Sequence, residues 1–218
     1  MMKILILIIG FIILPVYAHQ PRLVYDQELT RENPKIVVNP EVSQAFYGQL
    51  KSKPEYYKIF SDKDFNLYVG IVVPDKEDAR TDFYIDVSIE DTTIVLNGET
   101  FQWEKFFEKF GGDNYLKGPE FETKVPSGEY LIKVYNQDNQ GSYSLVIGKI
   151  EAFPPKEAIN AILSLPKLKK DFFAKSPFTA FFNYIGLFLL ITLVVVTGII
   201  LLIVFIVRRI TKRKKYIR

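Results

Sequence analysis

The chain has 218 residues, no cysteine, one histidine and a formal net charge of +3. This composition excludes disulfides, thiolate metal sites, cysteine nucleophiles and multi-histidine metal sites. The charge is unevenly spread, because residues 19–177 hold 20 Lys/Arg and all 25 Asp/Glu, while the last eleven residues hold seven Lys/Arg and no acid. We therefore expect no nucleic-acid partner, and no motif in the chain predicts a cofactor.

Residues 1–18, MMKILILIIGFIILPVYA, have the pattern of a signal peptide. Lys3 precedes an apolar run that Pro15 interrupts, and Val16 and Ala18 suit a cleavage site before His19. The alternative is an uncleaved anchor, although the run is short for a hydrocarbon core of ~30 Å. We expect cleavage and export of the residues that follow. His19 then becomes the mature N-terminus, which excludes Ser-His-Asp catalysis.

Residues 19–40 predict an extended lead-in, and residues 41–152 predict an all-β ectodomain, an antiparallel and jelly-roll-like β-sandwich. The evidence is alternation of apolar and polar residues between turn signals such as Asn97-Gly98 and Pro126-Ser127-Gly128. No helices of 10–15 residues alternate with these runs, so a parallel α/β sheet is not expected. The clearest predicted strands are Phe65–Val73, Phe83–Glu90, Tyr130–Tyr135 and Ser142–Ile147, and the weaker ones are Ala45–Leu50, Tyr56–Phe60, Thr93–Leu96 and Phe121–Val125.

One segment of the ectodomain, Thr100–Gly112, breaks the alternation. Its large apolar residues recur at i, i+3, i+4 and i+7, which is one face of a helix. We expect one short helix here, ended by a glycine and covering an end or face of the sandwich. The residues of that face are Trp103, Phe106, Phe107 and Phe110.

Residues 153–177 form an amphipathic juxtamembrane segment of apolar residues and lysines. Two placements remain open. The segment either lies on the outer lipid headgroups or packs its apolar side back onto the sandwich. Pro166 limits any continuous helix.

Residues 178–207 contain no Asp, Glu, Lys, Arg or His and predict a single transmembrane helix. The basic tail, residues 208–218, follows directly and marks the cytoplasmic side of the membrane. Together with the signal peptide it predicts a single-pass cell-membrane protein with its N-terminal domain outside the cytoplasm. The residues that set this topology are Arg208, Arg209, Lys212, Arg213, Lys214 and Lys215.

Aromatic residues offer a candidate ligand platform, because aromatic rings stack on sugar rings. The alternative is that these side chains belong to the core or to an amphipathic surface. The candidate residues are Trp103, Tyr115, Tyr68, Tyr84 and Tyr135.

Asp113 and Asp138, each beside a turn with an adjacent Asn, are weak calcium candidates, and further acids alternate along a predicted strand at Asp82, Asp86, Glu90 and Asp91. Calcium requires six to eight oxygen ligands, and the chain has no dense D-x-D-x-D-G loop. We therefore expect solvated acids and no metal site.

Two stretches resemble the bacterial pre-peptidase C-terminal type of β-sandwich. GQLKSKPEYYKIFSDKDFNLYVGIVVPD (Gly48–Asp75) resembles its opening, with Glu55–Ile59 in the place of an aromatic-rich strand. VPSGEYLIKVYNQDNQGSYSLVIG (Val125–Gly148) resembles its closing hairpin. The resemblance spans about residues 48–148. It implies an accessory module without catalytic residues of its own, here joined to an expected membrane anchor in place of a secreted enzyme.

These features predict a non-catalytic, single-pass cell-surface protein whose exported β-sandwich binds or scaffolds an envelope ligand, a glycan or a protein. The alternative is an accessory subunit that positions a membrane enzyme or transporter. A carboxylate-dependent hydrolase is the third class, and nothing in the sequence assembles its acid/base pair.

Overall fold

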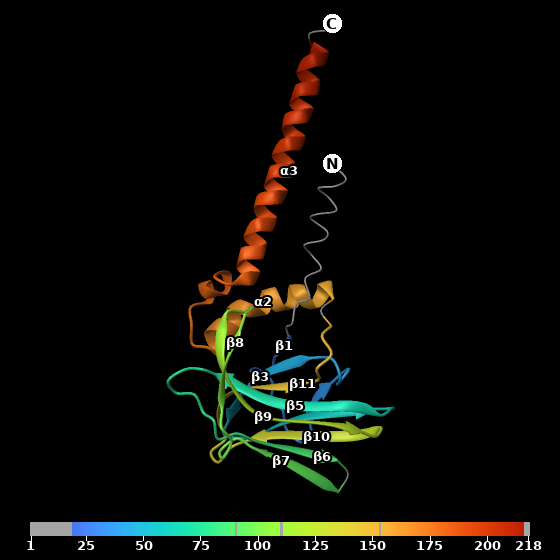
Figure 1. The fold of residues 1–218 in the computed structure, drawn as a ribbon, viewed down its shortest axis with the longest axis vertical. Coiled ribbons are helices and arrows are strands. Elements are labelled where there is room, and N and C mark those ends of the chain that lie inside the picture. The colour runs from blue at the N-terminus through green and yellow to red at the C-terminus, as the bar shows by residue number, and fades with distance from the viewer. Residues whose placement is uncertain (1–18, 90, 110, 153, 216–218) are drawn as a thin grey trace.

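The computed structural model describes residues 19–215 except residues 90, 110 and 153. The predicted signal peptide, residues 1–18, and the last three residues of the basic tail lie outside the described residues. The described strands form two sheets packed face to face, with one helix lying across the sandwich and a second, long helix projecting away from it (Figure 1).

The first sheet has six strands and the second has five. In spatial order the first sheet contains β1 (Gln20–Leu23), β3 (Gln44–Lys51), β11 (Gln140–Ile147), β5 (Phe65–Pro74), β9 (Asp113–Val125) and β8 (Glu104–Glu108). The second contains β2 (Lys35–Val37), β4 (Glu55–Ser61), β10 (Gly128–Tyr135), β6 (Tyr84–Ile89) and β7 (Thr92–Asn97).

The predicted β-sandwich is present and its strand pairs are mostly antiparallel, but each sheet also contains one parallel pair. β1 pairs in parallel with β3, and β2 pairs in parallel with β4. The chain alternates between the two sheets over these four strands, so each parallel pair is joined through a strand of the opposite sheet. A parallel pair requires such a crossover and cannot be closed by a tight hairpin. The predicted lead-in, residues 19–40, therefore supplies β1 and β2 to the sandwich.

The core lies between the two sheets, and all eight predicted strands are present there. The apolar positions of the alternating runs are at most 2% exposed in β5, β10 and β11, which confirms the predicted inward faces. Burial of this apolar surface is the main force that holds the sheets together. The inward residues of these strands are Phe65, Leu67, Val69, Ile71, Val73, Tyr130, Ile132, Val134, Tyr143, Leu145 and Ile147.

The predicted helix over Thr100–Gly112 is wrong. Glu104–Glu108 forms β8, an edge strand paired antiparallel with β9. Phe106 and Phe107 are 46% and 52% exposed, on opposite faces of the strand rather than on one buried helical face. Aromatic residues suit strands as well as helices, and β9 offers backbone partners that a short isolated helix lacks.

α2 (Pro155–Asp171) lies across the outer face of the first sheet and begins with a proline at its first position. Its buried residues form a second apolar cluster with Ala45, Tyr47 and Tyr115 of that sheet. The juxtamembrane segment therefore packs onto the sandwich, the second of the two predicted placements. The cluster residues from this segment are Leu165, Leu168, Phe172 and Phe173.

A short 3-10 helix, η1 (Pro177–Phe181), connects α2 to α3 (Tyr184–Lys215). Within α3, Tyr184–Thr211 is long and apolar enough to cross a membrane, and its most apolar part is not covered by the rest of the described chain. Part of the basic tail, Arg208–Lys215, continues this helix. In Figure 1 α3 extends away from the side of the sandwich that α2 covers.

Candidate functional site

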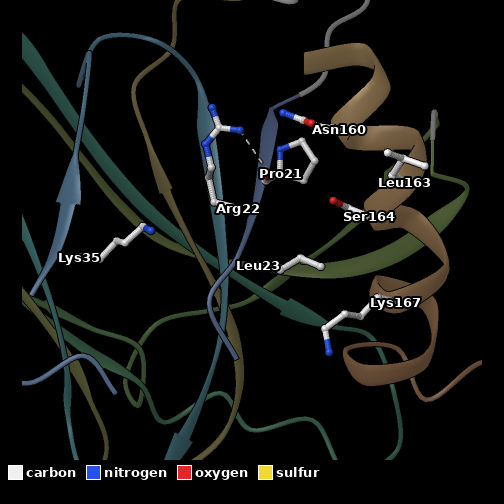
Figure 2. Close-up of a pocket in the computed structure, with 8 residues that line it drawn as sticks. All are labelled: Pro21, Arg22, Leu23, Lys35, Asn160, Leu163, Ser164 and Lys167. Carbon is white, nitrogen blue, oxygen red and sulfur yellow. Dashed lines mark hydrogen bonds between the residues drawn. The ribbon is translucent and has the colours of Figure 1, made fainter. Parts of the chain in front are cut away.

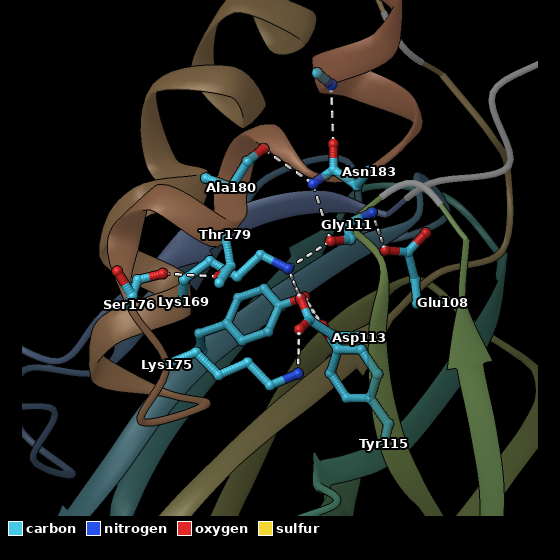
Figure 3. A network of polar contacts seen from close by, with 12 residues as sticks. Glu108, Gly111, Asp113, Tyr115, Lys169, Lys175, Ser176, Thr179, Ala180 and Asn183 are labelled. Atoms are coloured by element: carbon cyan, nitrogen blue, oxygen red, sulfur yellow. Dashed lines mark hydrogen bonds and ion pairs between the residues drawn. The ribbon is translucent and has the colours of Figure 1, made fainter.

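A buried ion-pair network joins the sandwich to the helices (Figure 3). Asp113, at the start of β9, receives Lys169 Nζ of α2 at 2.5 Å on one carboxylate oxygen and Lys175 Nζ at 2.9 Å on the other. The side chains of Asp113 and Lys169 are 1% and 2% exposed, whereas Lys175 is 44% exposed. Both oxygens of the carboxylate are thus occupied by cations that come from the segment leading to α3.

The carbonyl oxygen of Gly111 ties the two helices to the same point of the sandwich. It accepts a hydrogen bond from Lys169 Nζ at 2.5 Å and another from Asn183 Nδ2 at 3.0 Å. Asn183 also accepts the backbone N–H of Gly186 at 2.9 Å and so caps the first turn of α3. Gly112 has φ +70° and lies close to Asn183, where a Cβ would approach the Asn183 Cβ at 3.1 Å. The turn between β8 and β9, α2 and the start of α3 therefore form one connected unit. We call this unit the junction: Gly111, Asp113, Lys169, Lys175 and Asn183.

Aromatic side chains form the floor of the junction. The hydroxyls of Tyr47 and Tyr115 lie 3.0 Å apart, and both rings contact Phe172. Burial raises the pKa of both tyrosines, so they stay neutral. An ion pair on such a floor is little screened by water, and its desolvation is costly unless every partner is present. Both oxygens of Asp113 have a lysine partner, which indicates that the junction fixes how the helices sit on the sandwich.

Sequence reasoning did not identify the junction, although one signal was available. Lys169 stands among Leu165, Leu168 and Phe172 at helical spacing, so a lysine occupies the apolar face of an amphipathic helix. A charge at such a position requires a buried partner.

Of the five platform residues, the structure brings Tyr84 and Tyr135 together. Their rings stack with centroids 5.4 Å apart and an interplanar angle of 20°. Tyr84 donates a hydrogen bond to Glu99, and Tyr135 donates one to Asp86 at 3.1 Å. The two rings line a shallow cavity of about 450 Å³, which we call the tyrosine pocket: Asp82, Tyr84, Glu99, Tyr135, Asn136, Gln137 and Asn139.

The other three platform residues lie elsewhere. Tyr115 is buried in the junction floor. Tyr68, on the first sheet, donates a hydrogen bond to Glu120 at 2.7 Å. Trp103 is partly buried against the core, its indole N–H donates to the Gly98 carbonyl at 2.8 Å, and its ring covers Gly118. Only two of the five residues therefore share a surface.

The two calcium candidates are both engaged by cations. Asp113 binds two lysines in the junction, and Asp138 binds Arg80, whose hydrogen bonds hold the pKa of Asp138 below its ordinary value. Within the described part of the chain, no group of three or more histidine or acidic residues could hold a metal ion.

His19 contacts Ser43, its ring Nδ1 lying within hydrogen-bond distance of the hydroxyl. Ser43 is 1% exposed. A nucleophile has to reach its substrate, so this buried hydroxyl is a packing partner of His19.

A second shallow cavity, of about 410 Å³, lies between β1 and α2 (Figure 2). Three of its lining side chains are basic: Arg22, Lys35 and Lys167. Arg22 pairs with Glu157 of α2 at 2.6 Å, and Lys167 pairs with Asp171 at 2.7 Å. Lys167 also pairs with Asp26 at 3.5 Å, so carboxylates offset two of the three basic side chains of this open groove along α2.

These features define a β-sandwich module that carries one apolar helix long enough to span a membrane. No family model matches the chain, and no curated protein matches it. Among solved structures it is similar to the pre-peptidase C-terminal domain of a collagenase from Bacillus anthracis, with 10% identity and a TM-score of 0.34, over 56% of this chain and 97% of that one. That domain is of the class that residues 48–148 resemble in sequence.

A second similar structure is a β-glucosidase from Paenibacillus barengoltzii, with 10% identity and a TM-score of 0.26. The match covers 60% of this chain and 13% of the glucosidase chain. At this identity both likenesses concern the fold alone.

Proposed function

We propose that this protein is a non-catalytic, single-pass membrane protein whose exported β-sandwich binds an extracytoplasmic ligand, a glycan or a protein. One observation carries the proposal. The tyrosine pocket lies on the outer face of the second sheet, whereas α2 and the start of α3 lie on the opposite side of the sandwich. A ligand site is thereby directed away from the candidate membrane span.

The orientation in the membrane rests on charge. Arg208 and Arg209 end the apolar stretch of α3, and basic residues beside a span favour the cytoplasmic side. The sandwich, at the other end of α3, then lies outside the cytoplasm.

The chemistry of the tyrosine pocket favours binding over catalysis. Tyr84 and Tyr135 supply an aromatic surface, and carboxylate and amide groups surround it, which is a composition suited to polyhydroxylated or peptide ligands. Arg80 holds the pKa of Asp82 below its ordinary value, which suits a permanent anion rather than a general acid.

The junction favours a second candidate, an accessory subunit that positions a membrane enzyme or transporter. The buried ion pair of Asp113 with Lys169 ties the sandwich to α2, and the hydrogen bond from Asn183 to Gly111 ties it to the residue before α3. A fixed orientation would let the sandwich contact a neighbouring membrane protein at a defined angle.

Binding is tested with the full chain in nanodiscs, on a glycan array and by co-purification from membranes. We expect Tyr84→Ala to weaken binding of a captured glycan or protein about fivefold or more, as for loss of an aromatic contact of ~1 kcal/mol. Phe60→Ala is the matched control, because Phe60 is 70% exposed on the same sheet and outside the tyrosine pocket. A stoichiometric membrane partner that survives Tyr84→Ala would favour the accessory role.

Topology is tested by cysteine labelling, since the chain has no cysteine of its own. Val95→Cys, on β7 and 53% exposed, should react with a membrane-impermeant maleimide on intact cells. Lys214→Cys in the tail should react only after the membrane is opened. The reverse pattern would overturn the orientation.

A further inference from the structure

The face of α2 turned away from the sandwich carries an exposed stripe of mixed chemistry. Its residues recur at intervals of three or four, so they lie along one side of the helix. Two are apolar, with Ile159 57% and Leu163 72% exposed. The others are lysines. We call this set the α2 stripe: Lys156, Ile159, Leu163, Lys167 and Lys170.

At 3.6 residues per turn, the α2 stripe lies opposite the buried residues Leu165, Leu168 and Phe172. Those residues pack on the outer face of the first sheet. The α2 stripe therefore lies on the side of the helix away from these buried contacts, and Leu163 and Lys167 also line the groove beside β1. α3 extends from the side of the sandwich that α2 covers (Figure 1).

The junction places the end of α2 at the level where α3 begins. Lys169 of α2 and Asn183, the residue before α3, both donate to the same atom, the Gly111 carbonyl oxygen. The span candidate starts at Tyr184, one residue later. The last turn of α2 and the residue before the candidate span therefore bind the same carbonyl oxygen.

Aromatic side chains next to this point are exposed. Phe178 is 75%, Phe181 56% and Phe182 85% exposed, and Tyr184 is 60% exposed. Large apolar rings seldom face water in a cluster, and aromatic rings are enriched at membrane interfaces. The segment between α2 and α3 therefore has the composition of the interfacial layer.

From these observations, and resting on the proposed membrane span, we propose that the α2 stripe lies on the phospholipid headgroups of the leaflet from which α3 emerges. Ile159 and Leu163 dip into the headgroup region while Lys156 and Lys170 lie beside lipid phosphates. Lys167 pairs with Asp171 and Asp26, so the phosphate contacts are assigned to Lys156 and Lys170. A basic amphipathic helix with an apolar stripe is the form that binds such a surface. α2 would then contact the sandwich with one face and the membrane with the other.

The test uses the full chain reconstituted in vesicles of phosphatidylcholine and phosphatidylglycerol. Each variant carries one cysteine labelled with an environment-sensitive fluorophore, and the lipid carries a nitroxide quencher either at the headgroup or deep in the acyl chain. Leu163→Cys reports on the α2 stripe. Val95→Cys on β7 is the control for water, and Val194→Cys in α3, 63% exposed, is the control for the span. Emission of the single tryptophan, Trp103, checks that each variant is folded.

We expect headgroup nitroxide to quench the Leu163→Cys label about threefold or more above the Val95→Cys label, because an interfacial helix lies within ~5–10 Å of the headgroup boundary. Deep nitroxide should instead quench the Val194→Cys label most strongly. Adding Lys156→Glu and Lys170→Glu should reduce quenching at position 163.

Two results would overturn the proposal, and they differ from each other. If the Val194→Cys label is quenched while the Leu163→Cys label behaves like the Val95→Cys label, α3 spans the membrane and α2 stands clear of it. If the Val194→Cys label is not quenched either, α3 does not insert, and the proposed membrane function falls together with the surface contact.

Discussion

Replacing Lys169 with methionine tests whether the junction holds the helices on the sandwich. The ammonium of Lys169 donates to Asp113 and to the Gly111 carbonyl, both at 2.5 Å, and the side chain is 2% exposed. Methionine fills similar volume without the charge. The substitution leaves Asp113, itself 1% exposed, with Lys175 as its remaining cation.

The cost follows from the burial of that carboxylate. Removing one partner of a buried ion pair destabilises proteins by ~3–5 kcal/mol, because an uncompensated charge stays behind. Lys175 still neutralises Asp113, so we expect about 3 kcal/mol, the lower end of that range. Lys167→Met is the matched control two residues earlier on α2. Lys167 is 46% exposed and pairs with Asp171 and Asp26, which are 29% and 82% exposed, and each such exposed pair contributes ~0.2–1 kcal/mol.

The free energy of unfolding is measured by chemical denaturation of the full chain in nanodiscs, with Trp103 emission as the signal for the sandwich. Native-state hydrogen exchange of α2 is measured alongside, because a helix can open locally before the sandwich unfolds. Adding Asp113→Asn to Lys169→Met should recover much of the loss, since the buried carboxylate that lost one of its two cations is then neutral. A loss in both measurements no larger than that of Lys167→Met would refute the role given to the buried pair.

Three further predictions concern the sandwich. Burial raises the pKa of Glu55 from its ordinary 4.5 to about 7. Between these two pH values the folded state holds a proton that the unfolded chain has released. The free energy of unfolding should therefore fall by about 3 kcal/mol as pH rises across this range, at ~1.36 kcal/mol per pH unit. Glu55→Gln should flatten that dependence in urea titrations at pH 5 and pH 8, and an unchanged profile would show that another group titrates. Gly118→Ala should cost about 1–3 kcal/mol in thermal unfolding and shift Trp103 emission to the red, because the new Cβ would lie 2.5 Å from the indole ring; unchanged emission would mean that the ring does not pack there. Ile85→Asp should abolish folding, since a buried unpaired charge costs several kcal/mol of a total free energy of unfolding of ~5–15 kcal/mol. Asp86→Asn, on the outer face, should change the melting temperature little. Equal melting temperatures for the two variants would reverse the assigned faces.

The strands could be predicted because their two faces meet different surroundings. In β10 the buried residues Tyr130, Ile132 and Val134 alternate with partly exposed ones, and period-2 alternation is a local property that each strand carries in its own residues. The glycine and proline turns that separate the strands are local as well. Such features need no knowledge of the partner strand.

The prediction failed where a distant partner decides the structure. β8 has helical spacing of aromatic residues, but the edge of β9 supplies its backbone partners. The parallel pairing of β1 with β3, and of β2 with β4, depends on crossovers between the sheets. The buried pair of Lys169 and Asp113 joins residues 56 positions apart, and neither side chain identifies its partner from local sequence. Tyr84 and Tyr135 lie opposite each other in register across β6 and β10, and that register likewise appears only when the strands pair.

The Gly111 carbonyl, shared by α2 and the residue before α3, limits how far this module can reach. A domain on a flexible tether sweeps a volume that grows with tether length, and it meets ligands at many heights above the bilayer. Here Lys169 and Asn183, on either side of the short connecting segment, both bind Gly111, so we expect the sandwich to keep a fixed height above the bilayer if α3 spans it. Under the proposed function, ligands that project to that height would reach the tyrosine pocket, and shorter ligands would not.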